Sequence, residues 1–294
     1  MMRVSDNMTS LYIERQMAQA QSRVLSATRQ VSSGLRVERP GDDPAAAANI
    51  VETQAAARAA AQHGENIERA LGVAELSEST LGQIGELLSR ARELTVQMSS
   101  DTVSASERAT AAEEIAGIRE QIIGLANTEH AGDALFAGFQ TDADAFDANG
   151  VYQGDSGERV VAVGEGVTMR VGVNGTVFTA ASGGLDIFAE LEALRTALAS
   201  DDIAGVRAGT ETMEQAREQV TSARAGVGDD IERLLGQADQ VTGRALSLDL
   251  ERARLGDADA VAALSELVNA QQTLRTSAEI TTRLLAAPSL VELL

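Results

Sequence analysis

The chain contains no cysteine, no lysine and no tryptophan among its 294 residues, and it has only three prolines. Without cysteine it forms no disulfide and no thiolate zinc site, and it has no thiol nucleophile. Without lysine it can form no Schiff base and no phosphate-binding loop of the kind that uses a lysine. Only 2% of the residues are aromatic, whereas 44% are hydrophobic. This balance is typical of long packed helices rather than of an enzyme barrel.

The charge is strongly negative, because 24 basic residues, all of them Arg, face 44 acidic residues and leave a net charge of -20. Such a chain repels the phosphates of nucleic acid, so we expect no nucleic-acid partner. It has no apolar run of about 18 residues, the length that a spanning helix needs, which predicts no membrane insertion. Residues 1–10 contain no apolar segment followed by a cleavage site, which predicts that no cleavable signal peptide is present.

Apolar residues recur at alternating spacings of four and three near both ends of the chain. The first seam predicts a helix over about residues 8–34 and comprises Ile13, Met17, Ala20, Val24, Ala27 and Val31. The last seam predicts a helix that is capped by Gly256-Asp257 and ended by Pro288; it comprises Leu264, Leu267, Gln271, Leu274, Ala278, Thr281 and Leu285. Residues 1–40 have an excess of Arg and residues 257–294 an excess of acids, so opposite charges favour pairing of the two helices.

Cap residues predict the starts of three further helices: Asp43 with Pro44, Ser104 with its capping-box partner Glu107, and Asp186. Helical periodicity extends these helices to about residues 98, 132 and 200. A long helix with its own seam then follows from about residue 201 to 256.

Between about residues 136 and 185 the pattern changes to that of strands. All five Phe and Tyr152 lie between residues 136 and 188, which predicts a small β unit with an aromatic core. Strands are expected at 159–163 and 167–173, and Asn174-Gly175 predicts a hairpin turn. The chain is therefore expected to be mainly α, with a long antiparallel helical bundle or coiled coil formed by its N- and C-terminal segments and a small β-rich inserted domain. The expected domains are terminal helices at 1–40 and 257–294, a helical rod at 41–135 and 186–256, and the insert at 136–185.

Candidate catalytic and metal-binding residues are few. His63 and His130 each lack a positioned carboxylate in the sequence, so we expect structural roles for both. The acidic stretch that starts at Asp142 superficially resembles a calcium loop, but Asp147 and Gln153 stand where such a loop requires Gly and Glu. We therefore expect no enzyme, no bound metal and no cofactor.

Two adjacent stretches resemble the N-terminal signature of the flagellin superfamily, namely Gln30–Val37 and Arg39–Ala48. Shorter similar stretches follow along most of the chain, at 65–67, 91–96, 125–128, 135–138, 151–155 and 289–294. The signature loop, Arg39, Pro40, Asp42, Asp43 and Pro44, is similar to that of hook-associated members of the superfamily more than to that of filament flagellins.

The resemblance implies a structural subunit that forms a homo-oligomeric ring, the junction between a hook-side junction protein and the flagellin filament. It implies that the terminal helices form an inner tube, that the longer helices form the next shell and that the insert lies outermost. It also implies an extracellular place on the bacterial flagellum. The subunit would be exported unfolded by the flagellar type III apparatus, with the help of a chaperone and without a cleaved signal peptide.

The terminal seams predict the mechanism of assembly. We hypothesise that the terminal helices become ordered only against neighbouring subunits, because their narrow, alanine-rich seams close a monomeric core poorly. The residues expected to pack between subunits are Ile13, Met17, Val24, Val31, Leu264, Leu267 and Leu274. Two alternatives remain open at this point: a filament flagellin, and a secreted helical adhesin or effector.

Overall fold

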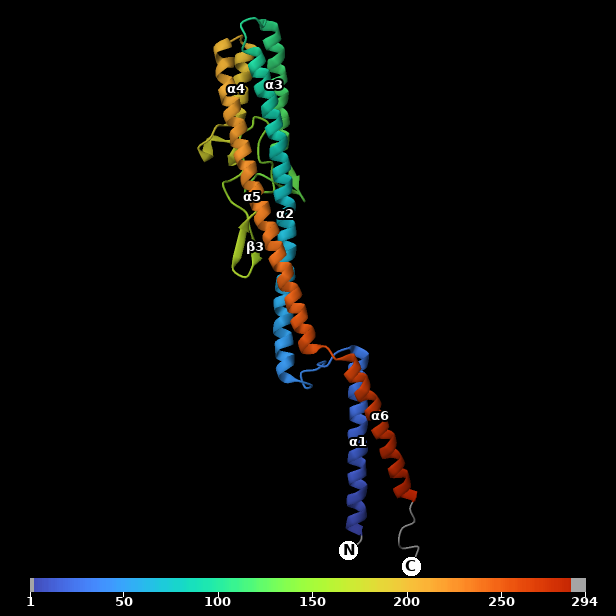
Figure 1. Cartoon of the computed structure of the whole chain (residues 1–294). Helices are drawn as coiled ribbons and strands as arrows, with labels where there is room; N and C mark the ends of the chain where they lie inside the picture. Colours follow the sequence, from blue (N-terminus) through green and yellow to red (C-terminus); the bar gives the residue numbers. More distant parts are fainter. Residues whose placement is uncertain (1–2, 287–294) are drawn as a thin grey trace, which may run out of the picture. The chain divides into compact units, whose positions relative to one another are not determined.

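The computed structural model describes residues 3–286. These residues form six α-helices, two short 3-10 helices and two two-stranded antiparallel sheets (Figure 1). Residues 3–59 and 244–286 form one compact unit, and residues 60–243 form a second. Two long helices, α2 (Pro44–Met98) and α5 (Ile203–Gly256), contribute to both units. The predicted mainly α fold with a small β element is confirmed.

In the first unit, α1 (Arg3–Ser33) and α6 (Ala260–Ala286) lie side by side and run in opposite directions (Figure 1). The fully buried side chains between them are small: Ala20, Ala27, Ala263 and Ala270. The predicted seam of α1 is therefore correct at its two alanines. The seam of α6, expected through Leu264 and Gln271, instead runs through Ala263 and Ala270, one residue earlier.

The predicted N-caps of three helices are confirmed: Asp43 accepts from the backbone N–H of Ala46 at 3.0 Å, Ser104 forms the capping box with Glu107, and Asp186 accepts from Ala189 at 2.9 Å. The predicted cap of α6 is wrong. Asp257 forms a β-bridge with Leu35, so the helix begins three residues later. Asp259 caps it by accepting from the backbone N–H groups of residues 261 and 262. The predicted end at Pro288 lies outside the described residues.

The second unit is a bundle of α3 (Ala105–Ala126), α4 (Ile187–Ala199) and long parts of α2 and α5 (Figure 1). Its core consists of aliphatic residues at helical spacing, among them Ile67, Leu81, Ile84, Leu88, Ile115, Ile122, Leu191, Leu198 and Met213. Helix α3 ends at Ala126, whereas the sequence predicted an end near Gly132. The next residue, Asn127, uses its side chain to donate to and accept from the backbone of Phe146, which turns the chain into the insert.

The strands of the insert are short. β1 (Glu129–His130) pairs with β2 (Asp133–Ala134), and β3 (Val160–Gly164) pairs with β4 (Val167–Arg170). β3 therefore matches the expected strand closely, whereas β4 ends before the expected residue 173. The β3–β4 hairpin docks on the bundle because Asn66 of α2 donates to the carbonyl of Ala162 at 2.9 Å and Gln237 of α5 donates to that of Val163 at 3.2 Å.

The predicted hairpin turn at Asn174-Gly175 is wrong. Asn174 instead caps the 3-10 helix η1 (Gly175–Phe178), and a second short helix, η2 (Ala180–Ser182), follows. Packing explains the difference, because a Cβ on Gly175 would lie 2.4 Å from the ring of Tyr152. Glycine at this position therefore allows the ring of Tyr152 to approach the backbone closely, and the backbone itself does not have a positive φ.

An aromatic cluster forms the core of the insert, as predicted. It comprises Phe136, Phe146, Tyr152, Phe178 and the first-turn residue of α4, Phe188, with ring centroids 5.0–6.4 Å apart. The prediction fails for Phe139, whose side chain is 65% exposed. The cluster joins the insert to the bundle, because Phe188 belongs to the bundle helix α4 and its ring packs against Phe146 and Phe178 of the insert.

Candidate assembly surface

The outer face of α6 carries large apolar side chains that the chain itself leaves uncovered. Val261 is 76% exposed, and Leu264 and Val268 are each 54% exposed. Their spacings of three and four place them on one flank of the helix, and the exposed Gln271 and Arg275 continue the same line. We call this the outer line of α6.

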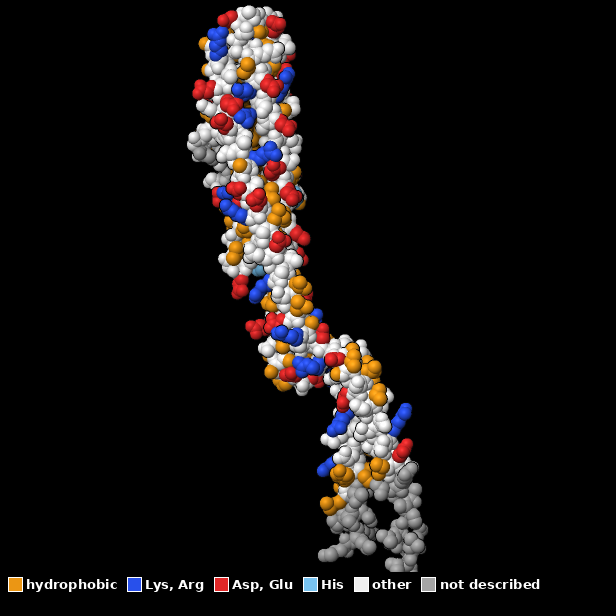
Figure 2. Space-filling model, viewed as in Figure 1, with side chains coloured by type: hydrophobic (Ala, Val, Ile, Leu, Met, Phe, Trp, Pro, Cys, Tyr) orange, Lys and Arg blue, Asp and Glu red, His pale blue; other side chains and the backbone are white. Residues whose placement is uncertain are grey.

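Helix α1 has a comparable line on the side opposite to its alanine seam. Its members alternate in spacings of three and four, and every one is exposed: Met8, Leu11, Arg15, Ala18, Ser22, Leu25 and Arg29. We call this the outer line of α1. Three of its members, Met8, Leu11 and Leu25, are large and apolar, so this side of α1 offers exposed apolar area away from α6. Figure 2 shows hydrophobic side chains at the surface of this unit, beside Arg and acidic residues.

The seven predicted packing residues divide into two groups. Ile13, Met17, Val24, Leu267 and Leu274 are half-buried on the faces that α1 and α6 turn toward each other, and Thr281 donates to the sulfur of Met17 at 3.6 Å. Val31 and Leu264 are exposed. Within one chain, then, the first group packs the helix pair and keeps part of its surface exposed, and the second group is exposed.

Residues 34–37, which precede the signature loop in the connection from α1 to α2, are bound to the turn between α5 and α6. The backbone N–H groups of Arg36 and Val37 donate to the carbonyl of Gly256, and Ala258 donates to that of Gly34 at 2.8 Å. We call residues 34–37 and 256–258 the strap. The strap satisfies carbonyl groups at the C-terminal end of α5 that have no partner within the helix.

Arg36 is the central side chain of the strap. Its guanidinium donates to the carbonyl of Leu255 at 2.6 Å and to the carboxylate of Asp43, the cap of α2, at 3.1 Å. A positive charge at the end of α5 also interacts favourably with the helix dipole. Sequence reasoning missed Arg36 as a contact residue, although it lies within the first of the two stretches that carry the resemblance.

The carboxylates of the signature loop accept hydrogen bonds from backbone N–H groups nearby in the sequence. The backbone N–H of Arg39 lowers the pKa of Asp42, and that of Glu38 adds to the effect. The pKa of Asp43 is lowered by the backbone N–H of Ala46 and then by Arg36. The side chain of Arg39 and the ring of Pro40 are exposed, and Pro44 begins α2.

The two histidines contact backbone and packing groups. The ring of His63 lies 3.4 Å from the carbonyl of Ala162, and the ring of His130 lies against Gly72. In residues 3–286 we find no group of three or more His, Asp or Glu side chains placed to hold a metal ion. Nor is any helix in this range both long and apolar enough to cross a bilayer.

Comparison with known proteins defines the class to which these features correspond. Residues 4–141 match the family model of the bacterial flagellin N-terminal helical region. The predicted resemblance to the flagellin superfamily is confirmed.

Over nearly its whole length the chain is homologous to flagellar hook-associated protein 3. It is 27% identical to that protein of Salmonella typhimurium, over 94% of this chain and 95% of the relative. A flagellar filament 33 kDa core protein of Treponema phagedenis is 23% identical over 87% and 86%. The fold matches a solved flagellar hook-associated protein of Vibrio parahaemolyticus with a TM-score of 0.68, over 74% of this chain and all of that one, at 22% identity.

Proposed function

We propose that this protein is a structural subunit of the bacterial flagellum that forms the junction between a hook-side junction protein and the flagellin filament. Its nearly full-length homology to flagellar hook-associated protein 3 supports the role. The observation that carries the assembly mechanism is the pair of exposed outer lines on α1 and α6, because a monomer gains nothing from a heptad repeat that faces water.

Assembly would bury these lines against neighbouring copies in a ring. Each large aliphatic side chain that becomes fully buried contributes roughly 1.5–3 kcal/mol, so a few per subunit stabilise a ring that has many identical contacts. In this arrangement residues 1–40 and 257–294 form the inner tube, 41–135 and 186–256 the rod, and 136–185 the outer part. Val31 and Leu264 pack between subunits, while the other five predicted residues position the helices within each subunit.

The proposal also includes the route by which the chain reaches the flagellum. The chain would travel unfolded through the flagellar type III apparatus, with a chaperone covering the apolar terminal seams beforehand, and without cleavage of a signal peptide. The absence of cysteine suits this route, because no disulfide can form to block an unfolded chain. We propose no catalytic activity and no cofactor.

The localisation of a single labelled residue tests the role. Because the chain has no cysteine, an exposed loop residue can be changed to give one unique thiol, for example Gln140→Cys, and labelled with a maleimide dye on intact flagella. We expect one spot per flagellum, at the boundary between hook and filament. Flagella from cells with the unaltered chain, which offers the dye no thiol, are the matched control.

A filament subunit is the second candidate, and the Treponema phagedenis relative favours it. The same label would then lie along the whole filament, and deletion of the protein would remove the filament mass. Deletion of a junction protein would instead release intact flagellin into the medium. An adhesin or effector would leave flagella unlabelled, and no feature of the described residues favours it.

A further inference from the structure

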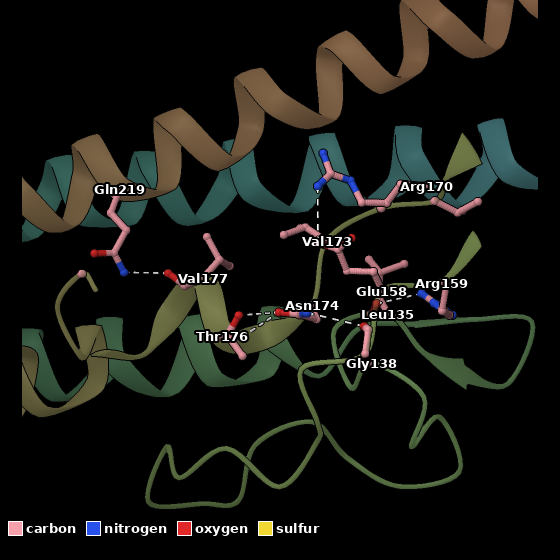
Figure 3. Close-up of a pocket in the computed structure, with 14 residues that line it drawn as sticks. Leu135, Gly138, Glu158, Arg159, Arg170, Val173, Asn174, Thr176, Val177 and Gln219 are labelled. Atoms are coloured by element: carbon pink, nitrogen blue, oxygen red, sulfur yellow. Dashed lines mark hydrogen bonds and ion pairs between the residues drawn. The ribbon is translucent and has the colours of Figure 1, made fainter. Parts of the chain in front are cut away.

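A pocket of about 280 Å³ lies where the insert meets α5 (Figure 3). Its walls come from the chain around Leu135, from residues 157–159 before β3, from Arg170 at the end of β4 with the segment that follows, and from Gln219 of α5. Leu135, Val173 and Val177 contribute apolar side chains to the lining, and Arg159 and Arg170 contribute two cations. The pocket lies entirely within the second unit.

The two arginines differ in what they bind. Arg170 donates to Asp230 at 3.1 Å and lies 3.5 Å from Glu158, and its hydrogen bond to Asp230 raises its pKa. Arg159 is half-buried and donates through one nitrogen, Nη2, to the carbonyl of Leu135 at 2.9 Å. Among the residues that the structure describes, this is the only hydrogen bond of its guanidinium, and Arg159 lines the pocket, so its other N–H groups are open to a ligand there.

The surroundings of Arg159 disfavour its charged form. Burial lowers its pKa, and the more distant charge of Asp133 offsets this only in part. A half-buried cation with four unused N–H groups is stabilised by an anion that accepts from them. The other donors of the lining are engaged: Arg170 is bound to Asp230 and lies near Glu158, the amide of Gln219 donates to Val177 and Leu185, and that of Asn174 donates to Gly157 at 3.4 Å.

The surroundings select the kind of anion. Glu158 lines the pocket and Asp133 lies near Arg159, so a doubly charged phosphate is repelled more strongly than a singly charged group. A planar carboxylate matches the guanidinium fork, and a short apolar body would contact the valines opposite. We propose that this pocket binds a carboxylate group through the guanidinium of Arg159. The carboxylate is supplied either by a small free acid or by an Asp or Glu side chain of a second copy of this chain.

Titration of the monomer tests the pocket directly. The ¹⁵N-labelled full chain is titrated with sodium propionate at constant ionic strength while the arginine Nε–Hε signals are followed by NMR. We expect saturable movement of one signal, assigned to Arg159 by its absence in Arg159→Gln. That variant keeps an amide donor for Leu135 and should bind propionate about tenfold more weakly or worse, since one charge-assisted contact contributes about that factor. Propionamide, which has the same shape without the charge, should move nothing.

Two further measurements identify the source of the carboxylate and check that the variants fold. If Arg159→Gln weakens self-association, and propionate weakens that of the unaltered chain only, the carboxylate comes from a second copy; if self-association is unchanged, it is a free acid. Arg159→Lys keeps the charge and checks folding by its thermal transition. The absence of saturable movement with propionate, together with unchanged self-association in Arg159→Gln, would overturn the proposal. Failure of the unaltered chain to assemble would count against the junction role alone, because the monomer titration does not depend on it.

Discussion

Arg36 donates a hydrogen bond from its guanidinium to the carbonyl of Leu255 at 2.6 Å, although the two residues are 219 positions apart in the chain. The contact joins the connection between α1 and α2 to the end of α5. Through its second contact, to Asp43, the same side chain also joins this connection to the start of α2.

Arg36→Gln should loosen the strap. The variant loses its charge-assisted contacts to Leu255 and Asp43, which are worth about 1 kcal/mol at a site as exposed as this one. We expect faster hydrogen exchange at the amides of Val37 and Ala258, with exchange in the bundle core unchanged. Arg39→Gln is the matched control, because the Arg39 side chain is exposed. Equal effects of the two variants would show that Arg36 has no special part.

The strap should also weaken in acid. The pKa of each of Asp42 and Asp43 is lowered below the ordinary 3.8, so each carboxylate stabilises the fold at neutral pH. That contribution is present above the unfolded-state pKa and is lost as the pH falls through the lowered value. Asp43→Asn, which keeps a capping oxygen, should reduce the acid sensitivity of amide exchange in the strap, whereas exposed Asp144→Asn should not. A pH profile unchanged by Asp43→Asn would contradict this account.

Two neighbouring residues of α1 should separate packing within a subunit from assembly. Leu25, on the outer line, is 64% exposed, whereas Val24 faces the helix pair. Leu25→Asp should prevent assembly while the helix content of the monomer stays the same. Val24→Asp should prevent assembly and also reduce the helix content, because it places a charge between α1 and α6. Circular dichroism and sedimentation measure the two properties, and normal junctions in Leu25→Asp cells would exclude the outer line as a contact.

A polar substitution on α6 gives an independent test of the outer lines. Val268→Asp should weaken self-association with little change in monomer stability, because Val268 is exposed in the monomer. Thr273→Asp is the matched control, since Thr273 is exposed on a different face of the same helix. Equal losses in the two variants would point to a general charge effect instead.

The aromatic cluster should control the stability of the second unit. Phe178→Ala removes a fully buried ring and should lower the free energy of unfolding by about 3–5 kcal/mol. Phe139→Ala removes an exposed ring and should change it by about 0.5 kcal/mol or less. Urea unfolding, followed by near-UV absorbance of the tyrosines and by helix content, measures both.

The sequence was sufficient for features that depend on neighbours along the chain. Asp43, Ser104 and Asp186 cap their helices because each cap is formed within a few residues. The predicted seam of α1 holds at Ala20, Val24 and Ala27, whereas Val31 is exposed. In α6, Leu267 and Leu274 of the predicted seam are half-buried, but Ala263 and Ala270 are buried in place of the exposed Leu264 and Gln271, because the close contact with α1 accommodates the smallest side chains.

Features set by residues far apart could not be derived in this way. Asn174-Gly175 is a strong local hairpin signal, but packing against Tyr152 decides its conformation. Phe139 carries no mark in the sequence that separates it from the buried Phe136. The strap and the Arg159 pocket each bring together segments whose contact depends on the whole fold.

The alanine seam has a mechanical consequence. The four fully buried side chains between α1 and α6 are small and the larger ones beside them are only half-buried, so the seam resists an axial slide of one helix along the other less than a closely interlocked seam would. The strap at the junction of the pair therefore acts as the pin that fixes their offset. A change in the strap is therefore expected to alter the offset of the two terminal helices within a subunit, far from the residues that are changed.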